Sequence, residues 1–279
     1  MVTASIVVHK TPEDQLLRAI DCIMQSSIDK LYILDNSPTE ELKGTIPENP
    51  EIIYKKINNN GYGAGHNIAI KEAMKSRSDY HLVMNADVAW EGDIILRLKD
   101  YMDMNPKIGM ISPKVYYPDG DLQYTCRMLP TPIDLIFKRF LPEKIIKRRM
   151  EKYLLTEHDH NKPINCPYLL GSFLFFRIKA LEESGIFDER FFMYPEDIDI
   201  TRRIHENWET LYWPEVKIIH EHQAASRKSM KMLGIHLKNM IKYFNKWGWI
   251  YDKKRKEYNL RLRKSMIPLP REERPKGRG

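Results

Sequence analysis

The stretch HLVMNADVAW, residues 81–90, places polar side chains directly after an apolar run. The run predicts a buried strand, and Asn85 and Asp87 follow at its end. TASIVVHK (3–10) and KLYILDNS (30–37) repeat this pattern, because each is a β-rich apolar run that finishes on polar residues. We therefore expect a series of buried strands whose ends carry polar side chains.

Segments with helical spacing separate these strands. Thr11-Pro12 opens the first, NIAIKEAMKS (67–76) forms the second, and GDIILRLKDYMDMN (92–105) forms the third. A further short strand is predicted at EIIYKKIN (51–58). Strands that alternate with helices predict an α/β fold with a Rossmann-like, mostly parallel central sheet flanked by helices.

The strand ends mark the place where a ligand is expected. Ligands of open parallel sheets bind outside the carboxyl ends of the strands, which is where Asp35, Asn85 and Asp87 fall. A divalent cation prefers oxygen ligands and is often held by one or two carboxylates together with substrate phosphates. Asp87 is therefore a candidate metal ligand, although an aspartate after a strand also serves as a turn former or helix cap.

The second half of the chain follows a looser pattern. KIGMISPKVYYPDG (107–120) predicts a strand and a turn, and residues 133–155 predict a basic amphipathic helical stretch broken at Pro142. LYWPEVKIIHEH (211–222) predicts a late strand that ends in two histidines. From 228 to about 263 the chain is predicted to be helical, and it is rich in basic and aromatic residues.

The charge distribution divides the chain near residue 226. Residues 227–279 hold 17 Lys and Arg against 4 Asp and Glu, so the total of 45 and 38 leaves 28 basic and 34 acidic side chains in the remainder. We predict one domain over 1–226, with halves 1–105 and 106–226. Residues 227–279 form a basic, aromatic, helical C-terminal extension with a disordered end.

A basic extension on a mildly acidic body suggests an anionic partner. An anionic membrane surface and a nucleic acid are the two candidates, and a merely solvated end is the alternative. The aromatic side chains interleaved with lysines, which are Tyr243, Phe244, Trp247, Trp249 and Tyr251, suit a membrane interface. They equally suit a helix that packs its aromatic side chains on the domain.

Composition excludes several other classes. No run of eighteen apolar residues exists, and the N-terminus has neither a basic region nor a cleavage site, so we expect a cytoplasmic protein. The three cysteines, Cys22, Cys126 and Cys166, are too few and too widely spaced for a disulfide framework or a zinc site.

The segment NNNGYGAGHNIAI (58–70) contains Gly61, Gly63 and Gly65 just before a predicted helix. Glycines there allow the backbone to approach a phosphate or ribose closely, and the helix N-terminus favours anions. The segment matches neither the P-loop nor the dinucleotide fingerprint. A plain tight turn is an equally good interpretation of these residues alone.

Two later groups contain candidate catalytic and binding side chains. YPEDIDI (194–200) puts Glu196, Asp197 and Asp199 at the start of a helix, where carboxylates either complement the helix dipole or act as a general base. His220 and His222 point to the same face of the late strand, and they suit a metal or phosphate contact or a structural role.

The order of these motifs resembles a family 2 glycosyltransferase of the GT-A fold, and within it the rhamnosyltransferase-like enzymes of bacterial polysaccharide assembly. The resemblance covers roughly residues 3–230. It rests on the strand end VVHK, Asp35-Asn36-Ser37, the segment Asn59 to Asn67, Asn85-Ala86-Asp87, Gly171-Ser172, FMYPEDIDI, and His220 with Ser226.

The resemblance implies a nucleotide-diphosphate sugar donor and a divalent metal, Mg²⁺ or Mn²⁺, with 1–105 as the nucleotide-binding half and 106–226 as the acceptor-binding half. Asp87 and His220 are implied as metal ligands, and Asp197 as the base that deprotonates an acceptor hydroxyl with inversion at the anomeric carbon. Glu196, Asp199, Gly171 and Ser172 are implied to support the acceptor. The implied donor-binding residues are Val8, His9, Asp35, Asn59, Gly61, Gly65, Asn67, Asn85 and Ala86.

The resemblance also implies the substrates. The favoured donor is dTDP-rhamnose, with a UDP-hexose as the alternative, and the acceptor is a glycan or a polyprenyl-linked glycan at the inner face of the cell membrane. Two departures stand out. The usual Asp-x-Asp motif is Asn85-Ala86-Asp87, and His222 competes with His220 as the late ligand.

Three other functions compete with this one. A nucleotidyltransferase would want a basic glycine-rich loop after the first strand, which VVHKTPED lacks. A non-catalytic nucleic-acid-binding protein would leave the acids at the strand ends without a role, so no nucleic acid is expected. A protein of the same fold that binds donor without turnover is distinguished only by an assay.

Overall fold

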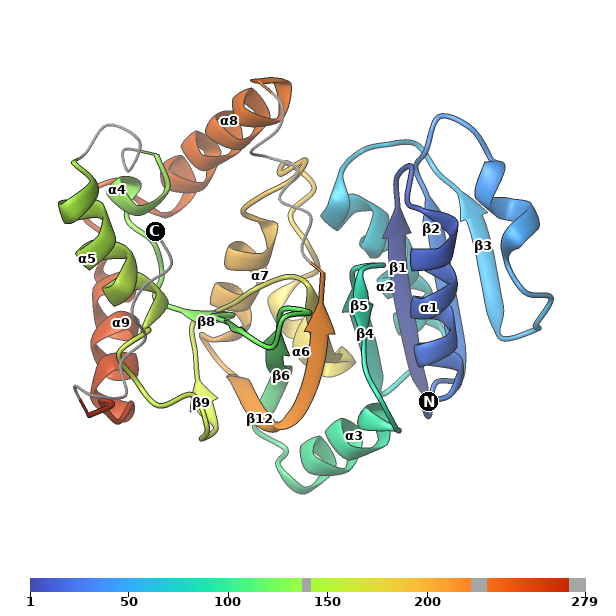
Figure 1. Cartoon of the computed structure of the whole chain (residues 1–279), viewed down its shortest axis with the longest axis horizontal. Helices are drawn as coiled ribbons and strands as arrows, with labels where there is room; N and C mark the ends of the chain where they lie inside the picture. The colour runs from blue at the N-terminus through green and yellow to red at the C-terminus, as the bar shows by residue number, and fades with distance from the viewer. Residues whose placement is uncertain (137–141, 222–229, 271–279) are drawn as a thin grey trace.

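The computed structural model describes residues 1–136, 142–221 and 230–270. Within these residues a ten-stranded sheet runs through the molecule in the order β3-β2-β1-β4-β11-β6-β12-β5 (Figure 1). Its first four strands are parallel, as the alternation of strands and helices predicted. They are β1 (Val2–Val8), β2 (Lys30–Asp35), β3 (Ile52–Lys56) and β4 (Tyr80–Met84).

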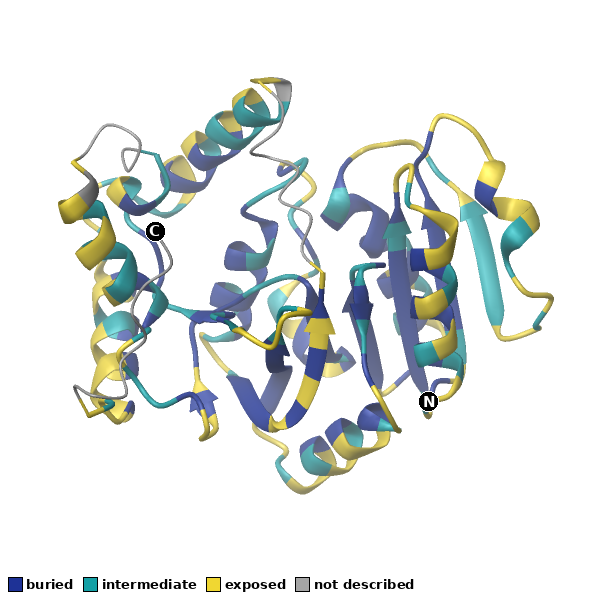
Figure 2. Cartoon of the chain, viewed as in Figure 1, coloured by how far each residue is buried: buried dark blue, intermediate teal, exposed yellow. Residues whose placement is uncertain are grey.

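The sheet is apolar on both faces because helices cover both. Helices α1 (Glu13–Met24) and α3 (Ile94–Met104) share a core with one face, and α2 (Tyr62–Lys75), α6 (Ile178–Ser184) and α7 (Glu196–Ile204) share a core with the other. The central strands are accordingly buried (Figure 2). This confirms the predicted α/β architecture.

The antiparallel strand β11 (Phe173–Arg177) lies between β4 and β6 (Ile108–Tyr116) and thereby assembles the site. Its Phe173 pairs with Met84, so the residues before β11 lie beside those that follow β4. On the other side, β12 (Glu209–His220) pairs with the short strand β5 (Val88–Ala89), with His220 opposite Val88. Both flanks of the segment 85–87 are therefore occupied by residues from the second half of the chain.

The predicted loop from 59 to 67 is wrong from Tyr62 onward, because α2 begins there. Gly63 and Gly65 lie within the first turns of α2, and a Cβ on them would stand 2.8 Å from Phe187 and 2.7 Å from Val7. Gly65 thus lets the helix pack closely on β1, and Gly63 lets it pack closely on the segment between α6 and α7. Gly61 is different, because it has φ +105° and a Cβ on it would meet the Phe192 backbone oxygen at 2.1 Å.

Short elements connect the two halves. The expected helical stretch around Pro142 appears as α4 (Pro132–Leu135) and α5 (Glu143–Leu154), and residues 137–141 lie outside the described residues. The small strands β8 (Cys126–Arg127) and β10 (Tyr168–Leu169) pair with each other. The remaining elements are a 3₁₀ turn η1 (Glu41–Thr45), β7 (Leu122–Gln123), which pairs with β6, and β9 (Ile164–Asn165), which pairs with β12.

The C-terminal extension is helical as predicted, and it packs on the rest of the chain. Helices α8 (Met230–Trp247) and α9 (Lys253–Ser265) share a core cluster with side chains from α5, α7, β10 and the residues directly after β8. Tyr243 and Phe244 are fully buried, whereas Tyr251 is 84% exposed. For Tyr243 and Phe244, packing against the protein is therefore the correct interpretation.

A buried ion pair ties the two C-terminal helices to α7. Asp252 accepts hydrogen bonds from both terminal nitrogens of the buried Arg202 side chain, at 2.7 and 2.6 Å. The Arg202 guanidinium also lies 4.0 Å from the centre of the Trp247 ring. In residues 1–136, 142–221 and 230–270, no helix has both the length and the apolar character needed to cross a membrane.

A hydrogen-bonded chain of buried polar side chains lies between the sheet and α2. His81 bonds Thr3 Oγ1 at 2.7 Å through Nδ1 and Ser5 Oγ at 2.8 Å through Nε2, and the Ser5 hydroxyl also meets His66 Nδ1 at 2.7 Å. All four residues are fully buried. Burial lowers the pKa of His81 to about 3, and it also holds the pKa of His66 well below its usual value.

These histidines predict loss of stability in acid. Their pKa values are lower in the folded chain than in the unfolded chain, so only the unfolded chain takes up protons as the pH falls from about 6.5 toward 3. The free energy of unfolding should fall by up to about 1.4 kcal/mol per pH unit for each histidine in that window and be level above it. Urea unfolding of wild type and His81→Asn at pH 7.5 and 5.0 measures this. The variant should show the smaller decrease, and equal decreases would contradict the assignment.

Candidate active site

Asp87 and His220 come together at the carboxyl edge of the sheet. The pairing of β5 with β12 brings His220 Nε2 to 3.2 Å from Asp87 Oδ1. Asn85 joins them, with its amide nitrogen 3.4 Å from the same imidazole nitrogen. His220 is 2% exposed, whereas Asn85 and Asp87 are half-buried. A carboxylate oxygen and an imidazole nitrogen that face each other in this way can both bind one cation.

Gln123 orients the imidazole, and the sequence offered no local sign of this role. The Gln123 amide nitrogen donates to the His220 carbonyl at 2.7 Å, so the Gln123 carbonyl oxygen faces His220 Nδ1 at 2.9 Å. That oxygen only accepts, which puts the hydrogen on Nδ1 and directs Nε2 toward Asp87 as a lone-pair donor. This is the tautomer that a metal requires, held by the outer-shell hydrogen bond common at such sites.

We predict that Gln123→Ala weakens Mn²⁺-dependent nucleotide binding by about 10- to 100-fold, because the imidazole loses its fixed tautomer and orientation. Calorimetric titration of Mn²⁺ into protein with excess UDP or dTDP gives the dissociation constant directly. Gln25→Ala, at an exposed glutamine of the α1 C-terminus, is the matched control. An unchanged Mn²⁺ constant in Gln123→Ala would show that His220 needs no such support.

The donor set fits a hard divalent cation that shares its coordination with a substrate. In the described parts of the chain no group of three or more His, Cys, Asp or Glu side chains surrounds a common point. Asp87 and His220 thus supply at most two protein ligands here, and Mg²⁺ and Mn²⁺ commonly complete such sets with phosphate oxygens and water. The residues present therefore fit a metal that binds together with a diphosphate.

Tyr62 joins the metal-ligand segment to the acceptor half. Its hydroxyl lies 3.0 Å from Asn85 Oδ1 and 2.9 Å from the Gly171 carbonyl oxygen. Next to Gly171, the Ser172 backbone carbonyl accepts a hydrogen bond from the Asn85 backbone amide at 3.0 Å. The buried Ser172 hydroxyl has no hydrogen-bond partner among the described residues. Gly171 and Ser172 therefore form the floor between Asn85 and the carboxylates of α7.

The Asp197 carboxylate lies directly beside Gly171. Its Oδ2 accepts the Gly171 amide at 3.1 Å and the Tyr168 hydroxyl at 3.3 Å, and its Oδ1 accepts the Ile198 amide at 2.8 Å. Gly171 leaves room for this approach, because a Cβ there would lie 3.0 Å from Asp197 Cβ. Burial raises the pKa of the Asp197 carboxyl above its usual value, although these hydrogen bonds and the nearby Arg127 charge oppose the rise.

The neighbouring Glu196 differs in protonation. It is 5% exposed, and its Oε2 has no hydrogen-bond partner among the described residues. Burial and the adjacent Asp197 charge raise the pKa of Glu196 to about 8. Glu196 is therefore mostly protonated at neutral pH, and Asp197 is the better proton acceptor of the two.

Asp199 points away from this floor and holds the C-terminal helix. Its carboxylate pairs with Arg203 at 2.8 Å and Lys246 at 2.7 Å, and it accepts the Trp247 indole hydrogen at 2.8 Å. The residue is fully buried. Asp199 thus orients Arg203 on its own helix and links α7 to Lys246 and Trp247 of α8.

Asp35 lies at the other end of the same edge. Its buried carboxylate accepts the Ser37 amide at 2.8 Å and the Tyr54 hydroxyl at 2.7 Å, and Lys56 Nζ lies 3.9 Å away. Although burial raises the pKa of Asp35, these hydrogen bonds and the Lys56 charge outweigh it and hold that pKa below its usual range. Beside it, Val8 is buried at the end of β1, and His9 Nδ1 lies 2.9 Å from Asn36 Oδ1.

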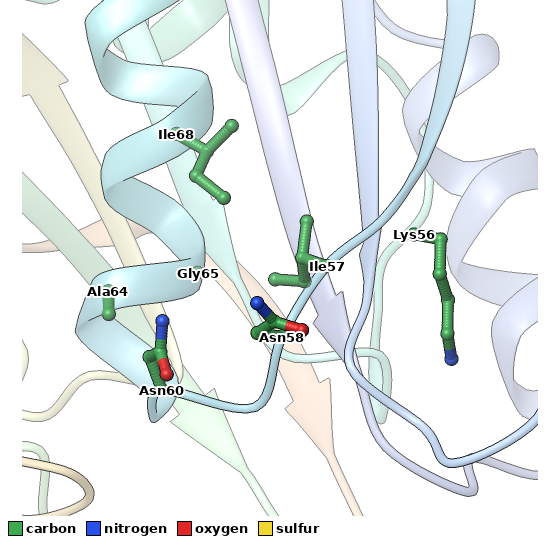
Figure 3. Close-up of a pocket in the computed structure, with 7 residues that line it drawn as sticks. All are labelled: Lys56, Ile57, Asn58, Asn60, Ala64, Gly65 and Ile68. Carbon is green, nitrogen blue, oxygen red and sulfur yellow. The ribbon is translucent and has the colours of Figure 1, made fainter.

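A cavity of about 410 Å³ opens between the end of β3 and the start of α2. Figure 3 shows the lining residues Ile57 and Asn58 on the segment after β3, Asn60 just before α2, and Ile68 on α2. A second cavity of similar volume lies on the other side of β2, beside Lys10, Ser37 and Thr39. Asn58 and Asn60 flank the predicted Asn59 and were not predicted themselves, although the run of three asparagines is a signal that could have indicated them.

Other residues expected to bind the donor are placed differently. Gly65 lines the first cavity, but the position where it would carry a Cβ is in contact with the Val7 side chain. The corresponding position of Gly61 is in contact with the Phe192 backbone. The Asn67 amide donates to the Phe187 carbonyl at 2.9 Å, and its oxygen accepts the Phe187 amide at 3.0 Å. Asn67 therefore fastens α2 to the segment before α7. Ala86 is buried between Asn85 and Asp87, and His222 and Ser226 lie outside the described residues.

The family model described as "Glycosyl transferase family 2" matches residues 4–185. An N-acetylglucosaminyl-diphospho-decaprenol L-rhamnosyltransferase from Mycobacterium tuberculosis (strain CDC 1551 / Oshkosh) is 30% identical over 181 residues, which cover 60% of this chain and 57% of that protein. The low-salt glycan biosynthesis hexosyltransferase Agl10 from Haloferax volcanii is 24% identical over 202 residues, 71% of this chain and 60% of its own. The chain thus spans less than two thirds of these relatives.

Solved structures share the fold at low sequence identity. GalNAc-T7 with UDP, GalNAc and Mn²⁺ superposes with a TM-score of 0.67 at 14% identity, covering 88% of this chain and 48% of that one. The mannosyltransferase PcManGT from Pyrobaculum calidifontis, in complex with GDP-Man and Mn²⁺, gives 0.56 at 13% identity, with 86% and 64% covered. Both neighbours have the GT-A architecture expected from the order of the motifs.

Proposed function

Because the chain belongs to glycosyl transferase family 2, we propose that it transfers a sugar from a nucleotide-diphosphate donor to an acceptor hydroxyl, with inversion at the anomeric carbon. The observation that carries this is the continuous chain of contacts from His220 through Asn85, Tyr62 and Gly171 to Asp197. It joins a candidate metal pair to a candidate general base along one edge of the sheet.

The donor lies across this edge. The nucleoside occupies the space around Asp35 and the cavity at Asn58 and Asn60, and its diphosphate reaches Asn85 and Asp87. Asp87 and His220 would hold a divalent cation, Mg²⁺ or Mn²⁺. When bound, the cation neutralises negative charge that develops on the leaving nucleoside diphosphate.

Asp197 removes the acceptor proton. The carboxylate is held in place by Gly171, Ile198 and Tyr168, so it needs no reorganisation to face a hydroxyl above the Gly171-Ser172 floor. Glu196 keeps its own proton at neutral pH and donates a hydrogen bond to a sugar oxygen. The bond from the anomeric carbon to the diphosphate oxygen breaks as the acceptor oxygen attacks from the opposite face.

The favoured substrates follow the rhamnosyltransferase relative. They are dTDP-rhamnose as donor and a polyprenyl-linked glycan as acceptor, with a UDP-hexose as the alternative donor. Exposed basic and apolar side chains on α5 and α9, among them Arg261, Ile145 and Leu260, support contact with an anionic membrane surface. Each basic side chain near such a surface contributes on the order of 1 kcal/mol.

A thermal-shift panel tests the donor site. The protein is scanned with UDP, dTDP, GDP and CDP and their sugars, each with and without Mn²⁺ or Mg²⁺. A ligand at a hundred times its dissociation constant stabilises a fold by about 2.7 kcal/mol, which is readily measured. We expect a metal-dependent shift with dTDP or UDP, and no shift with any nucleotide would overturn the proposal.

A further inference from the structure

Arg127 is a half-buried cation without a carboxylate partner. Its Nε donates to the Tyr124 carbonyl at 2.7 Å, but its two terminal nitrogens donate to none of the described residues. No acidic side chain described in the structure lies within ion-pair distance of it, unlike Arg149, Arg202 and Arg203, which all have one. A guanidinium held in this way is a common means of binding an oxyanion, because its paired nitrogens match two oxygens at once.

The position of Arg127 relates it to Asp197. The pairing of β8 with β10 sets Arg127 opposite Tyr168, and its guanidinium carbon lies 5.8 Å from the centre of the Tyr168 ring. The hydroxyl of the same ring lies 3.3 Å from Asp197 Oδ2. The buried Tyr168 side chain thus contacts both the guanidinium and the candidate base, so Arg127 and Asp197 lie close to each other around one aromatic ring.

Arg127 lies on a different side of the candidate base from the proposed donor residues. Asp87 and His220 lie on the β5 and β12 side of Gly171, whereas Arg127 lies on the β8 and β10 side of Asp197. Burial lowers the pKa of Arg127, but the nearby Tyr168, Tyr153 and Asp197 side chains raise it by more. The pKa of Arg127 is therefore raised, and the side chain keeps its positive charge. Its position suits the acceptor, on the side of the base away from the metal pair.

We propose that Arg127 forms an oxyanion subsite that binds a phosphate or diphosphate group carried by the acceptor, one sugar ring from the hydroxyl that Asp197 deprotonates. This rests on the proposed function, and it deepens that function by assigning an acceptor class. The acceptor is a phosphorylated glycan whose first sugar reaches from Arg127 to Asp197 past the Tyr168 ring. A lipid-linked diphosphate and a phosphate on a free glycan share this chemistry.

Calorimetry with inorganic pyrophosphate and with geranyl diphosphate tests the subsite. Both titrations are run in EDTA, which removes the metal and so disables the donor site. Relative to wild type, Arg127→Met should bind both probes about 10- to 100-fold more weakly, since it loses charge-assisted hydrogen bonds. Arg127→Lys, which keeps the charge without the paired nitrogens, should fall between. Arg97→Met, at an exposed arginine of α3, is the matched control and should bind both probes like wild type.

The donor site supplies the second measurement. Binding of UDP or dTDP with Mn²⁺ should change by less than about twofold in Arg127→Met, which also shows that this variant is folded. Tighter binding of geranyl diphosphate than of pyrophosphate would assign the anion to a lipid-linked acceptor, and equal binding would assign it to a phosphorylated free glycan.

Three results would overturn the subsite: no pyrophosphate binding by wild type, equal binding by wild type and Arg127→Met, or an equal loss of nucleotide binding in that variant. If wild type instead binds pyrophosphate through Arg127 but binds no nucleotide with metal, the proposed donor site fails and the oxyanion subsite stands.

Discussion

Asp197→Asn should lower the rate of sugar transfer by about 10²- to 10⁴-fold and leave nucleotide binding within about twofold of wild type. An asparagine has nearly the same shape as an aspartate but cannot take up the acceptor proton. The proposed donor site is formed by Asp35, Asp87 and His220 and does not include Asp197. Donor binding should therefore be kept. Single-turnover transfer and nucleotide calorimetry on the same preparation separate the two effects.

Glu196→Gln is the matched control for this result. Because the pKa of Glu196 is raised to about 8, its carboxyl is mostly protonated at neutral pH, and a glutamine replaces it with little electrostatic change. Transfer should therefore persist in Glu196→Gln at pH 7. If Glu196→Gln abolished transfer while Asp197→Asn remained active, the roles of the two neighbouring carboxyls would have to be exchanged.

Asp87→Ala should abolish metal-dependent nucleotide binding, with a loss of about 100-fold or more in Mn²⁺ affinity in the presence of nucleotide. Asn85 stands where a second carboxylate is usual, so Asp87 is the only acid of the 85–87 segment and no neighbour replaces its charge. The variant keeps its backbone contact, because the Glu221 amide bonds the Asp87 carbonyl and not its side chain. Mn²⁺ titration with excess UDP or dTDP measures the loss.

Asp100→Ala controls for the removal of a carboxylate elsewhere. Asp100 lies on α3 with its side chain 58% exposed, and it is not part of the proposed metal pair. It should bind Mn²⁺ and nucleotide like wild type. An Asp87→Ala protein that still bound nucleotide only when Mn²⁺ was added would move the metal to other ligands.

The early part of the fold was predictable because its signals are local. The apolar runs at 3–10, 30–37, 51–58 and 79–87 alternate with helical segments, and each corresponds to a strand of the parallel half of the sheet. The prediction failed at Gly63 and Gly65, where small residues serve close packing of a helix and not a loop. Whether a glycine opens a loop or admits a neighbour depends on what lies against it, and local periodicity does not contain that information.

The candidate site was predictable only in its separate pieces. Asp87, His220 and Asp197 were identified from their positions after strands and at a helix start, and only the resemblance carried by the order of the motifs placed them in one site. Gln123 lies 97 residues from His220, and Arg127 lies 41 positions before Tyr168, so neither partnership has a spacing that could be recognised. Tyr62 was overlooked because it stood among the glycines that were interpreted as a loop.

The sequence by itself determined the class of fold, the edge of the sheet at which polar side chains gather, and the three residues of the 85–87 segment. Those properties follow from hydrophobic periodicity, which records the face that each segment buries. The tertiary structure decided which distant segments meet at that edge. Strand β11 enters antiparallel between β4 and β6 and sets Ser172 beside Asn85, and the pairing of β12 with β5 sets His220 beside Asp87. Strand order arises from contacts between residues far apart in the chain, so it is a property of the packed molecule as a whole.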